Sequence, residues 1–214
     1  MEYISFRDVS KGFGGTAVLE RTSFSINKGE ICGFIGRNGS GKTVIFKLMS
    51  GLLLPDSGTV AFCGENLSAK HRFIESMGVM IETPGFIPHY SGMKNLKILN
   101  SMSVNPVPAD EIRNLAARLR LDLKNRHPVR TYSLGMRQKL GIIQAVMNKP
   151  ELLILDEPMN SLDSGSVAEI RKLFTGLNKA GTTIVLASHI AEDIESLCTR
   201  KFVIENCKVK EAET

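Results

Sequence analysis

The sequence predicts an α/β fold in which a mainly parallel sheet is joined by an N-terminal antiparallel β subdomain and an inserted α-helical subdomain. Two short apolar runs, residues 152–155 and 183–187, are typical of strands buried on both faces of a parallel sheet. The first thirty residues alternate between apolar and polar positions, which predicts strands separated by turns. Residues 93–147 lose this alternation and acquire helical spacing of their apolar residues.

The N-terminal part predicts a small antiparallel sheet. Strands are expected over residues 3–9 and 18–26. A helix over 42–50 ends at Gly51, and a proline-containing turn then leads into a strand over 59–62. The turns around the first two strands are marked by Gly12, Gly14, Gly15 and Gly29.

The composition is that of an ordinary globular protein. The chain has 214 residues, 43% of them hydrophobic and 23% charged. We expect one domain over 1–214, with an α/β core from 1–83 and 149–214 and a helical subdomain over 84–148. No stretch approaches the roughly 18 apolar residues of a membrane span, and the start of the chain lacks signal-peptide features. We therefore expect a cytoplasmic protein that reaches a membrane only through a partner.

The charged and thiol side chains exclude some functions. The net charge of +5 is mild, and its clearest cluster, Lys70-His71-Arg72, is too short for a nucleic-acid track. We predict a solvated face there and no nucleic-acid partner. The four cysteines show neither a C-x-x-C pair nor metal-ligand spacing, so we expect free thiols, with Cys32 a core residue.

A phosphate-binding motif follows the apolar run 31–35. It fits G-x-x-x-x-G-K-[ST] without a mismatch and stands between a predicted strand and a predicted helix. Its glycines let backbone N–H groups surround a triphosphate, and the helix adds the positive end of its dipole. Lys42 can reach the β- and γ-phosphates, and the Thr43 hydroxyl can ligate Mg²⁺. The predicted nucleotide-binding residues of this loop are Gly36, Asn38, Gly39, Ser40, Gly41, Lys42 and Thr43.

Kinases, GTPases, helicases, recombinases and transport ATPases share such a loop, so further segments decide between them. The strand 152–155 ends in Asp156 and Glu157. Asp156 is placed to hold Mg²⁺ through water, and Glu157 to polarise a water for in-line attack on the γ-phosphate. His189 follows the next apolar run and can hydrogen-bond the γ-phosphate or that water, although a lone histidine is more often structural.

The segment around Ser133 predicts a second anion site. Ser133 precedes a helix expected over 139–147 and suits an N-cap, with its hydroxyl and nearby amides at a positive helix end. Alone, the segment is equally well explained as an ordinary capped helix. One nucleotide does not need two distant phosphate cradles, whereas two copies meeting head to tail do.

In this order the motifs resemble those of the nucleotide-binding subunit of ABC (ATP-binding cassette) transporters, over essentially the whole chain. Residues 36–43 are similar to the Walker A motif, and 152–157 to Walker B with its catalytic glutamate. Residues 132–136, Tyr-Ser-Leu-Gly-Met, resemble a divergent LSGGQ signature that keeps Ser133 and Gly135.

Further positions of the chain extend the resemblance. Ser161-Leu162-Asp163 is similar to the D-loop, His189 to the switch histidine, and Phe13 to the aromatic residue that stacks on adenine. The resemblance implies an ATPase with ATP and Mg²⁺ as cofactors, with Lys42, Glu157 and His189 as catalytic residues, and with Val18 and Val44 near the nucleotide. It also implies a homodimer or heterodimer of cassettes bound to a separate transmembrane permease at the inner face of the membrane.

Four positions depart from the common family pattern. Glu82 stands where most members have glutamine, and we expect it to join Thr43 and Asp156 as a Mg²⁺ ligand. Val44 replaces a second threonine in Walker A, and Leu134 and Met136 replace a glycine and a glutamine of the signature. Together, Glu-Thr-Pro-Gly-Phe and Tyr-Ser-Leu-Gly-Met resemble the bacitracin and lantibiotic branch, whose exporters protect cells against peptide antibiotics.

Other functions remain as alternatives. A DNA-repair or chromosome cassette needs a long coiled coil, and a translation cassette normally has two cassettes in tandem. A phosphotransferase leaves Ser133 and Asp163 unexplained. A non-transport regulatory ATPase or a nucleotide-gated binding module stays open, although Glu157 and His189 argue for catalysis.

Overall fold

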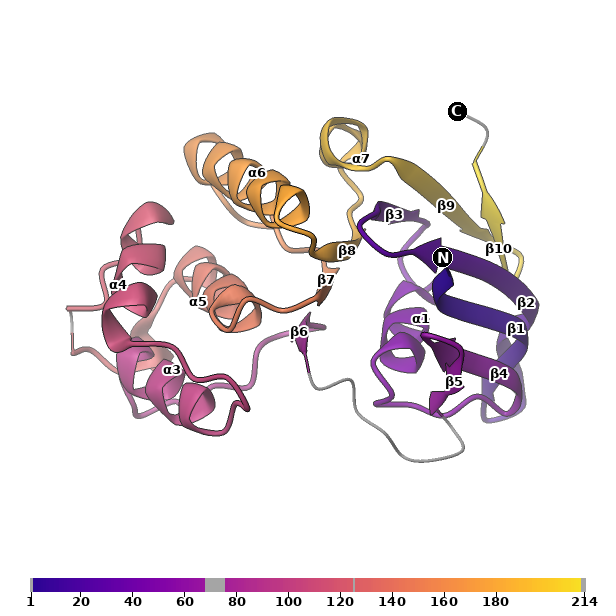
Figure 1. Cartoon of the computed structure of the whole chain (residues 1–214), viewed down its shortest axis with the longest axis horizontal. Helices are drawn as coiled ribbons and strands as arrows, with labels where there is room; N and C mark the ends of the chain where they lie inside the picture. The colour runs from indigo at the N-terminus through magenta and orange to yellow at the C-terminus, as the bar shows by residue number, and fades with distance from the viewer. Residues whose placement is uncertain (1, 68–75, 125, 213–214) are drawn as a thin grey trace.

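Two sheets form the framework of the computed structural model, which describes residues 2–67, 76–124 and 126–212 (Figure 1). One is an antiparallel sheet of order β2-β1-β4-β5, and the other has the order β10-β9-β3-β8-β7-β6. In the second sheet β9, β3, β8, β7 and β6 run parallel, while β10 pairs antiparallel with β9. The predicted α/β class is confirmed; the Lys70-His71-Arg72 cluster lies outside the described residues. The strands are β1 (Glu2–Phe13), β2 (Thr16–Asn27), β3 (Ile31–Ile35), β4 (Ser57–Phe62), β5 (Glu65–Asn66), β6 (Met77–Met80), β7 (Leu152–Asp156), β8 (Thr183–Ala187), β9 (Arg200–Glu205) and β10 (Lys208–Glu211).

The parallel sheet separates two hydrophobic cores. Along β7, Leu153 and Leu155 pack into a cluster with residues of the helices, whereas Leu152 and Ile154 pack into a cluster with the antiparallel sheet and α1. Both faces are therefore apolar, which explains why the run carries no polar alternation. Figure 1 shows the same division, with α3, α4 and α5 on one side and the antiparallel strands on the other.

Most of the longer helices begin at a side-chain cap. Ser91, Ser133 and Asp163 each accept a hydrogen bond from a backbone N–H three residues later, as N-caps of α3, α5 and α6. The region 84–148 contains α3, α4 and α5. The helices are α1 (Lys42–Met49), α3 (Gly92–Ser101), α4 (Ala109–Arg118), α5 (Leu134–Val146), α6 (Ser164–Lys179) and α7 (Ala191–Leu197), with a 3₁₀ turn η1 (Val129–Thr131). In the part of the chain that the structure describes, none of these helices has the length and apolarity to cross a bilayer.

Two local expectations were wrong. Gly12 lies within β1 and is not a turn residue; its missing Cβ lets the strand approach Thr16, whose carbonyl oxygen would lie 2.8 Å from that atom. Helix α5 begins at Leu134 and not at Lys139, because Ser133 Oγ accepts from the Met136 N–H and starts the helix there. The first two turns of α5 therefore lie beside the carboxyl end of β7.

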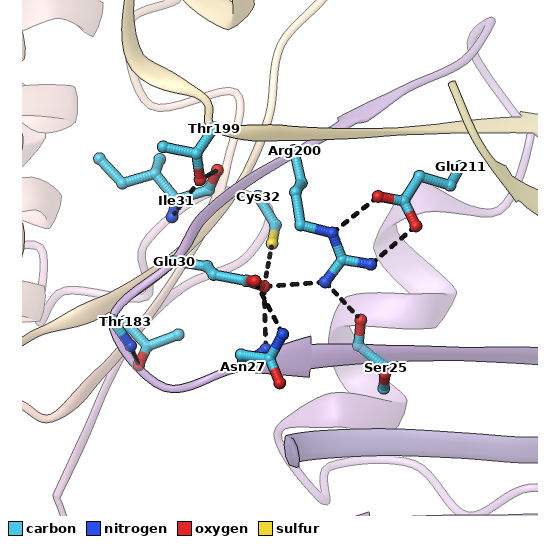
Figure 2. Close-up of polar contacts among 10 residues, drawn as sticks. Ser25, Asn27, Glu30, Ile31, Cys32, Thr183, Thr199, Arg200 and Glu211 are labelled. Carbon is cyan, nitrogen blue, oxygen red and sulfur yellow. Dashed lines mark hydrogen bonds and ion pairs between the residues drawn. The ribbon is translucent and has the colours of Figure 1, made fainter. Parts of the chain in front are cut away.

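A polar cluster anchors β9 and β10 beside the phosphate-loop strand β3. The Arg200 guanidinium donates to Glu30 at 2.8 Å, to both carboxylate oxygens of Glu211 at 2.7 Å, and to the Ser25 carbonyl at 3.0 Å (Figure 2). Asn27 donates to Glu30 from its backbone and its side chain. Hydrogen bonds from Arg200 lower the pKa of Glu211.

Glu30 shows that these hydrogen bonds outweigh desolvation. Its burial raises the pKa, but hydrogen bonds from Asn27 and Arg200 produce a net lowering. The Cys32 thiol also donates to Glu30, at 3.7 Å, and burial raises the pKa of that thiol. All four cysteines are free, as expected.

Replacing Arg200 with methionine tests this cluster. We expect Arg200→Met to lower the free energy of unfolding by about 2 kcal/mol, because Glu30 loses its positively charged partner. This loss is smaller than the one expected on breaking a fully buried ion pair. The lowered carboxylate pKa values mean that this stabilisation is present above about pH 4 and disappears as the pH falls through the folded-state pKa. The free energy of unfolding of the variant, measured with urea, should therefore fall less than that of the wild type as the pH is lowered.

Arg7→Met provides a matched control, since Arg7 pairs with Glu2 at an exposed site. It should change the free energy of unfolding by less than about 0.5 kcal/mol. Equal losses in the two variants would contradict a specific role for the Arg200 cluster.

Candidate nucleotide-binding and hydrolysis site

The loop between β3 and α1 curls around the ammonium group of Lys42. This Nζ donates to the carbonyl of Gly36 at 2.7 Å and to that of Arg37 at 3.1 Å, and the lysine is only 7% exposed. Gly39 and Gly41 have φ values of 78° and 105°, which residues with a Cβ rarely adopt. The loop therefore holds a buried positive charge in a backbone cradle.

The cradle has the properties needed to hold an anion. Ser40 Oγ is the buried side-chain polar atom that lacks a hydrogen-bond partner among the residues the structure describes. The N-cap of helix α1 is Gly41, which offers no capping side chain, so first-turn N–H groups stay available. A Cβ on Gly36 would lie 2.4 Å from Ser40 Oγ, so this position leaves no space for a side chain. These features fit the phosphates of a nucleotide.

Thr43 and Asp156 meet at the start of α1 and the end of β7. The Thr43 hydroxyl donates to Asp156 Oδ2 at 2.6 Å. Burial raises the pKa of Asp156, and the negative charges of Glu157 and Glu82 add to this, against the Thr43 hydrogen bond and Lys42. A cation here would relieve the charge strain on Asp156.

The oxygen donors suit magnesium better than a metal that needs a protein cage. In the described ranges, no group of three or more His, Cys, Asp or Glu side chains could hold a metal ion. Mg²⁺ commonly uses one or two protein oxygens, with water and substrate phosphates completing its shell. Thr43 and Asp156 fit that mode of binding.

Glu157 lies against His189 from the neighbouring strand end. His189 Nδ1 is 2.7 Å from Glu157 Oε2, and the His189 backbone N–H donates to the same oxygen at 3.3 Å. The backbone of Glu157 is left-handed, with φ 49°, and its N–H donates to the Ala187 carbonyl at 3.0 Å. The carboxylate is thus presented at the sheet edge by an unusual backbone conformation.

Glu82 is held by a lysine of α1. Glu82 Oε1 accepts from Lys47 Nζ at 2.7 Å, and Glu82 has a left-handed backbone with φ 59°. The residue lines the same cleft as Thr43 and Asp156. In this conformation its carboxylate is paired with Lys47, a contact that the sequence did not indicate.

Most of the predicted site residues line a single cleft of about 520 Å³. Ser133 and Asp163 do not line the cleft, and their side chains cap their own helices. Hydrogen bonds from Ser166 lower the pKa of Asp163. Phe13 also lies outside the lining of the cleft and is 51% exposed, with Lys11 Nζ 5.4 Å from its ring centre. The predicted residues that line it are Val18, Asn38, Gly39, Gly41, Lys42, Thr43, Val44, Glu82, Asp156 and Glu157.

The remaining predicted residues flank this cleft. Gly36 and Ser40 belong to the phosphate loop itself, and His189 reaches the cleft through Glu157. Gly135 approaches the Ser161 carbonyl, which a Cβ at this position would meet at 3.1 Å. The signature turn and the D-loop segment are therefore neighbours within one chain.

Part of the cleft lining was not predicted from the sequence. Arg137 and Gln138 come from the first turns of α5, and Asn160 comes from the turn after Glu157; Ser161, expected only as part of a segment similar to the D-loop, also lines the cleft. Gln138 Nε2 donates to two backbone carbonyls at the carboxyl end of β7. The signal in the sequence was Ser133 as the N-cap of a helix that begins at Leu134. A helix with this start has Arg137 and Gln138 in its first turns.

A buried strand, a phosphate loop and a helix, with an Asp-Glu pair ending a neighbouring parallel strand, define a P-loop nucleoside triphosphatase. Comparison with known proteins narrows this class. The family model described as ABC transporter matches residues 19–160. The chain therefore belongs to the ABC transporter family, as an ATP-binding cassette with ATPase activity.

Individual relatives agree with this assignment. An uncharacterised ABC transporter ATP-binding protein of Bacillus subtilis, YybJ, is 38% identical over 91% of this chain and 89% of its own length. The bacitracin transport ATP-binding protein BcrA of Enterococcus faecalis is 40% identical over 92% of this chain, which spans 65% of that protein. A solved ATP-binding subunit of an ABC transporter superposes with a TM-score of 0.86 at 25% identity, covering 98% of this chain and 89% of that one.

Gly36→Ala tests the shape of the phosphate cradle. The added methyl group would lie 2.4 Å from Ser40 Oγ and would force Ser40 to move within the loop, so we expect ATP affinity to fall by about tenfold or more, which is about 1.4 kcal/mol of binding free energy. Calorimetric titration with ATP measures the change. Gly85→Ala is the control, because a Cβ there meets nothing within 4 Å. Unchanged affinity in Gly36→Ala would contradict the assigned cradle.

Proposed function

We propose that this chain hydrolyses Mg-ATP and drives a separate membrane permease, as one of two cassettes that close head to tail over two ATP molecules. The observation that carries the proposal is the division of the predicted site. Lys42, Thr43, Asp156 and Glu157 converge at one sheet edge and line one cleft, whereas Ser133, the N-cap of α5, is not among the residues that line it. A second copy would supply the missing half.

Within one chain, each group has a distinct task. Lys42 and the N–H groups of the phosphate loop hold the phosphates. Thr43, Asp156 and Glu82 would hold Mg²⁺, which supplies charge neutralisation between the phosphate oxygens. Glu157 accepts the proton of the attacking water, and its hydrogen bond with His189 orients the carboxylate.

The dimer would complete the site from the outside. Ser133 and Gly135 of the second copy would face the γ-phosphate, with the positive end of α5 adding its dipole. Asp163 follows the turn that approaches Gly135 and would link the two sites. Leu134, 53% exposed at this helix start, supports an interface here.

The permease and its cargo follow from likeness to relatives. BcrA is named for bacitracin transport, and the sequence pattern around Glu82 and Ser133 resembles that branch. We therefore propose a bacitracin- or lantibiotic-like peptide antibiotic as the exported substrate, and a site for this chain at the inner face of the cell membrane. The loop 82–90 and the helical region would transmit closure to the permease.

Glu157→Gln separates ATP binding from hydrolysis. We expect turnover to fall by about a hundredfold or more, because the amide cannot accept the proton, while ATP still binds. Sedimentation of this variant should give a dimer with Mg-ATP and a monomer with Mg-ADP. Lys42→Ala is the control, which should bind ATP poorly and stay monomeric.

Normal turnover in Glu157→Gln would refute the role of the carboxylate. A monomer with ATP bound would refute a dimer formed by this chain alone. An ATPase that is stimulated by no permease on co-reconstitution would favour the regulatory alternative.

Glu82→Gln tests the carboxylate at the metal site. We expect the Mg²⁺ concentration for half-maximal activity to rise by about threefold, since an amide oxygen attracts Mg²⁺ less than a carboxylate. Lys47→Met should lower this Mg²⁺ concentration by up to about fivefold, because Lys47 then no longer competes with Mg²⁺ for Glu82. A change of about fivefold corresponds to the free energy of one surface ion pair. Lys28→Met, which breaks the remote exposed pair with Glu151, is the control. An unchanged Mg²⁺ dependence in Glu82→Gln would exclude this role.

A further inference from the structure

Gln138 connects helix α5 to the backbone beneath the catalytic carboxylate. Its Nε2 donates to the Glu157 carbonyl at 2.7 Å and to the Pro158 carbonyl at 3.0 Å. Both hydrogen bonds join residues about twenty positions apart in the sequence, from two different elements. A single amide group therefore fixes two successive peptide units at the end of β7.

These peptide units belong to a strained turn. Glu157 has φ 49° and Ser161 φ 62°, in the left-handed region that residues with a Cβ rarely occupy. Such a conformation persists only when surrounding contacts determine it. The Glu157 N–H donates to Ala187 on one side, and Gln138 holds the carbonyl on the other.

The side chain of Glu157 depends on this backbone. Its Oε2 meets His189 Nδ1 at 2.7 Å while the backbone of Glu157 is left-handed, with φ 49°. If the carbonyls of Glu157 and Pro158 were released, the turn could relax toward a common conformation. The carboxylate would then leave His189.

We infer that Gln138 is a positioning residue for the hydrolytic reaction, which holds the turn at Glu157 so that its carboxylate faces the attacking water. The inference rests on the proposed function of Glu157. Gln138 itself lines the cleft but acts through the backbone of the turn. Since Ser133 caps the same helix, the signature turn and the catalytic carboxylate are joined within one chain.

Substitutions at Gln138 test the two hydrogen bonds. Gln138→Met keeps the length of the side chain and removes both donors, and Gln138→Glu presents oxygens to the two carbonyls. We expect kcat to fall by about tenfold or more in both, with the ATP dissociation constant within about twofold of the wild type. Gln138→Lys, whose ammonium can donate to both carbonyls, should recover kcat to within about threefold.

Hydrogen exchange supplies a readout that does not depend on activity. The backbone amides of residues 157–161 should exchange faster in Gln138→Met than in the wild type, in the absence of nucleotide. Gln144→Met is the matched control, because Gln144 lies on the same helix and lines a different hollow beside Met102. It should change neither kcat nor exchange in the turn.

The outcomes separate this inference from the proposed function. If Glu157→Gln abolishes turnover but Gln138→Met leaves kcat and turn exchange unchanged, the positioning role is overturned and the proposed function stands. If Glu157→Gln turns over ATP normally, the role proposed for Glu157 is refuted, whatever the result for Gln138. A loss of kcat in Gln138→Met that Gln138→Lys does not recover would also overturn the hydrogen-bonding role.

Discussion

Parallel strands deliver their carboxyl ends to the same edge of a sheet, and the functional geometry of this protein depends on that constraint. The phosphate loop follows β3, the Asp156-Glu157 pair ends β7, and His189 follows β8. Because these strands are neighbours in the order β3-β8-β7, groups far apart in the sequence meet without further arrangement. The 2.6 Å contact between Thr43 and Asp156 across 113 positions is the clearest result.

The edge concentrates charge of both signs in a small space. The buried ammonium of Lys42 lies in the loop, while Asp156 and Glu157 stand opposite with Glu82 close by. The pKa of Asp156 is raised by its burial and by these carboxylates, so the acidic side of the cleft is not balanced by the protein alone. Magnesium bound with a triphosphate has the charge distribution that fits both sides.

Sequence patterns predicted the parts of this site that local spacing or strand order determines. The phosphate loop has a fixed spacing, and the positions of Asp156 and His189 follow from apolar runs that end at polar residues. Contacts between side chains of separate elements were not predictable. Lys47 meets Glu82 across 35 positions through a half-buried and an exposed side chain, and such a contact leaves no pattern in the sequence.

Helix starts and strand ends were the other source of error. Gly12 was interpreted as a turn because glycine favours turns, whereas here it permits close approach of two strands. The early start of α5 depends on one hydroxyl of Ser133, and this displacement hid the role of Gln138. Cap hydrogen bonds outweigh helical periodicity at such boundaries because they satisfy the first free N–H groups.

The uncapped start of α1 and the unpartnered Ser40 hydroxyl have a thermodynamic consequence. Both leave polar groups of the described loop unsatisfied in the folded chain, and phosphate oxygens can satisfy them. A ligand that binds only the folded state raises the free energy of unfolding by about 2.7 kcal/mol at one hundred times its dissociation constant. The stability of this protein is therefore linked to the ATP concentration around it, and a cell that runs short of ATP also weakens the fold that consumes it.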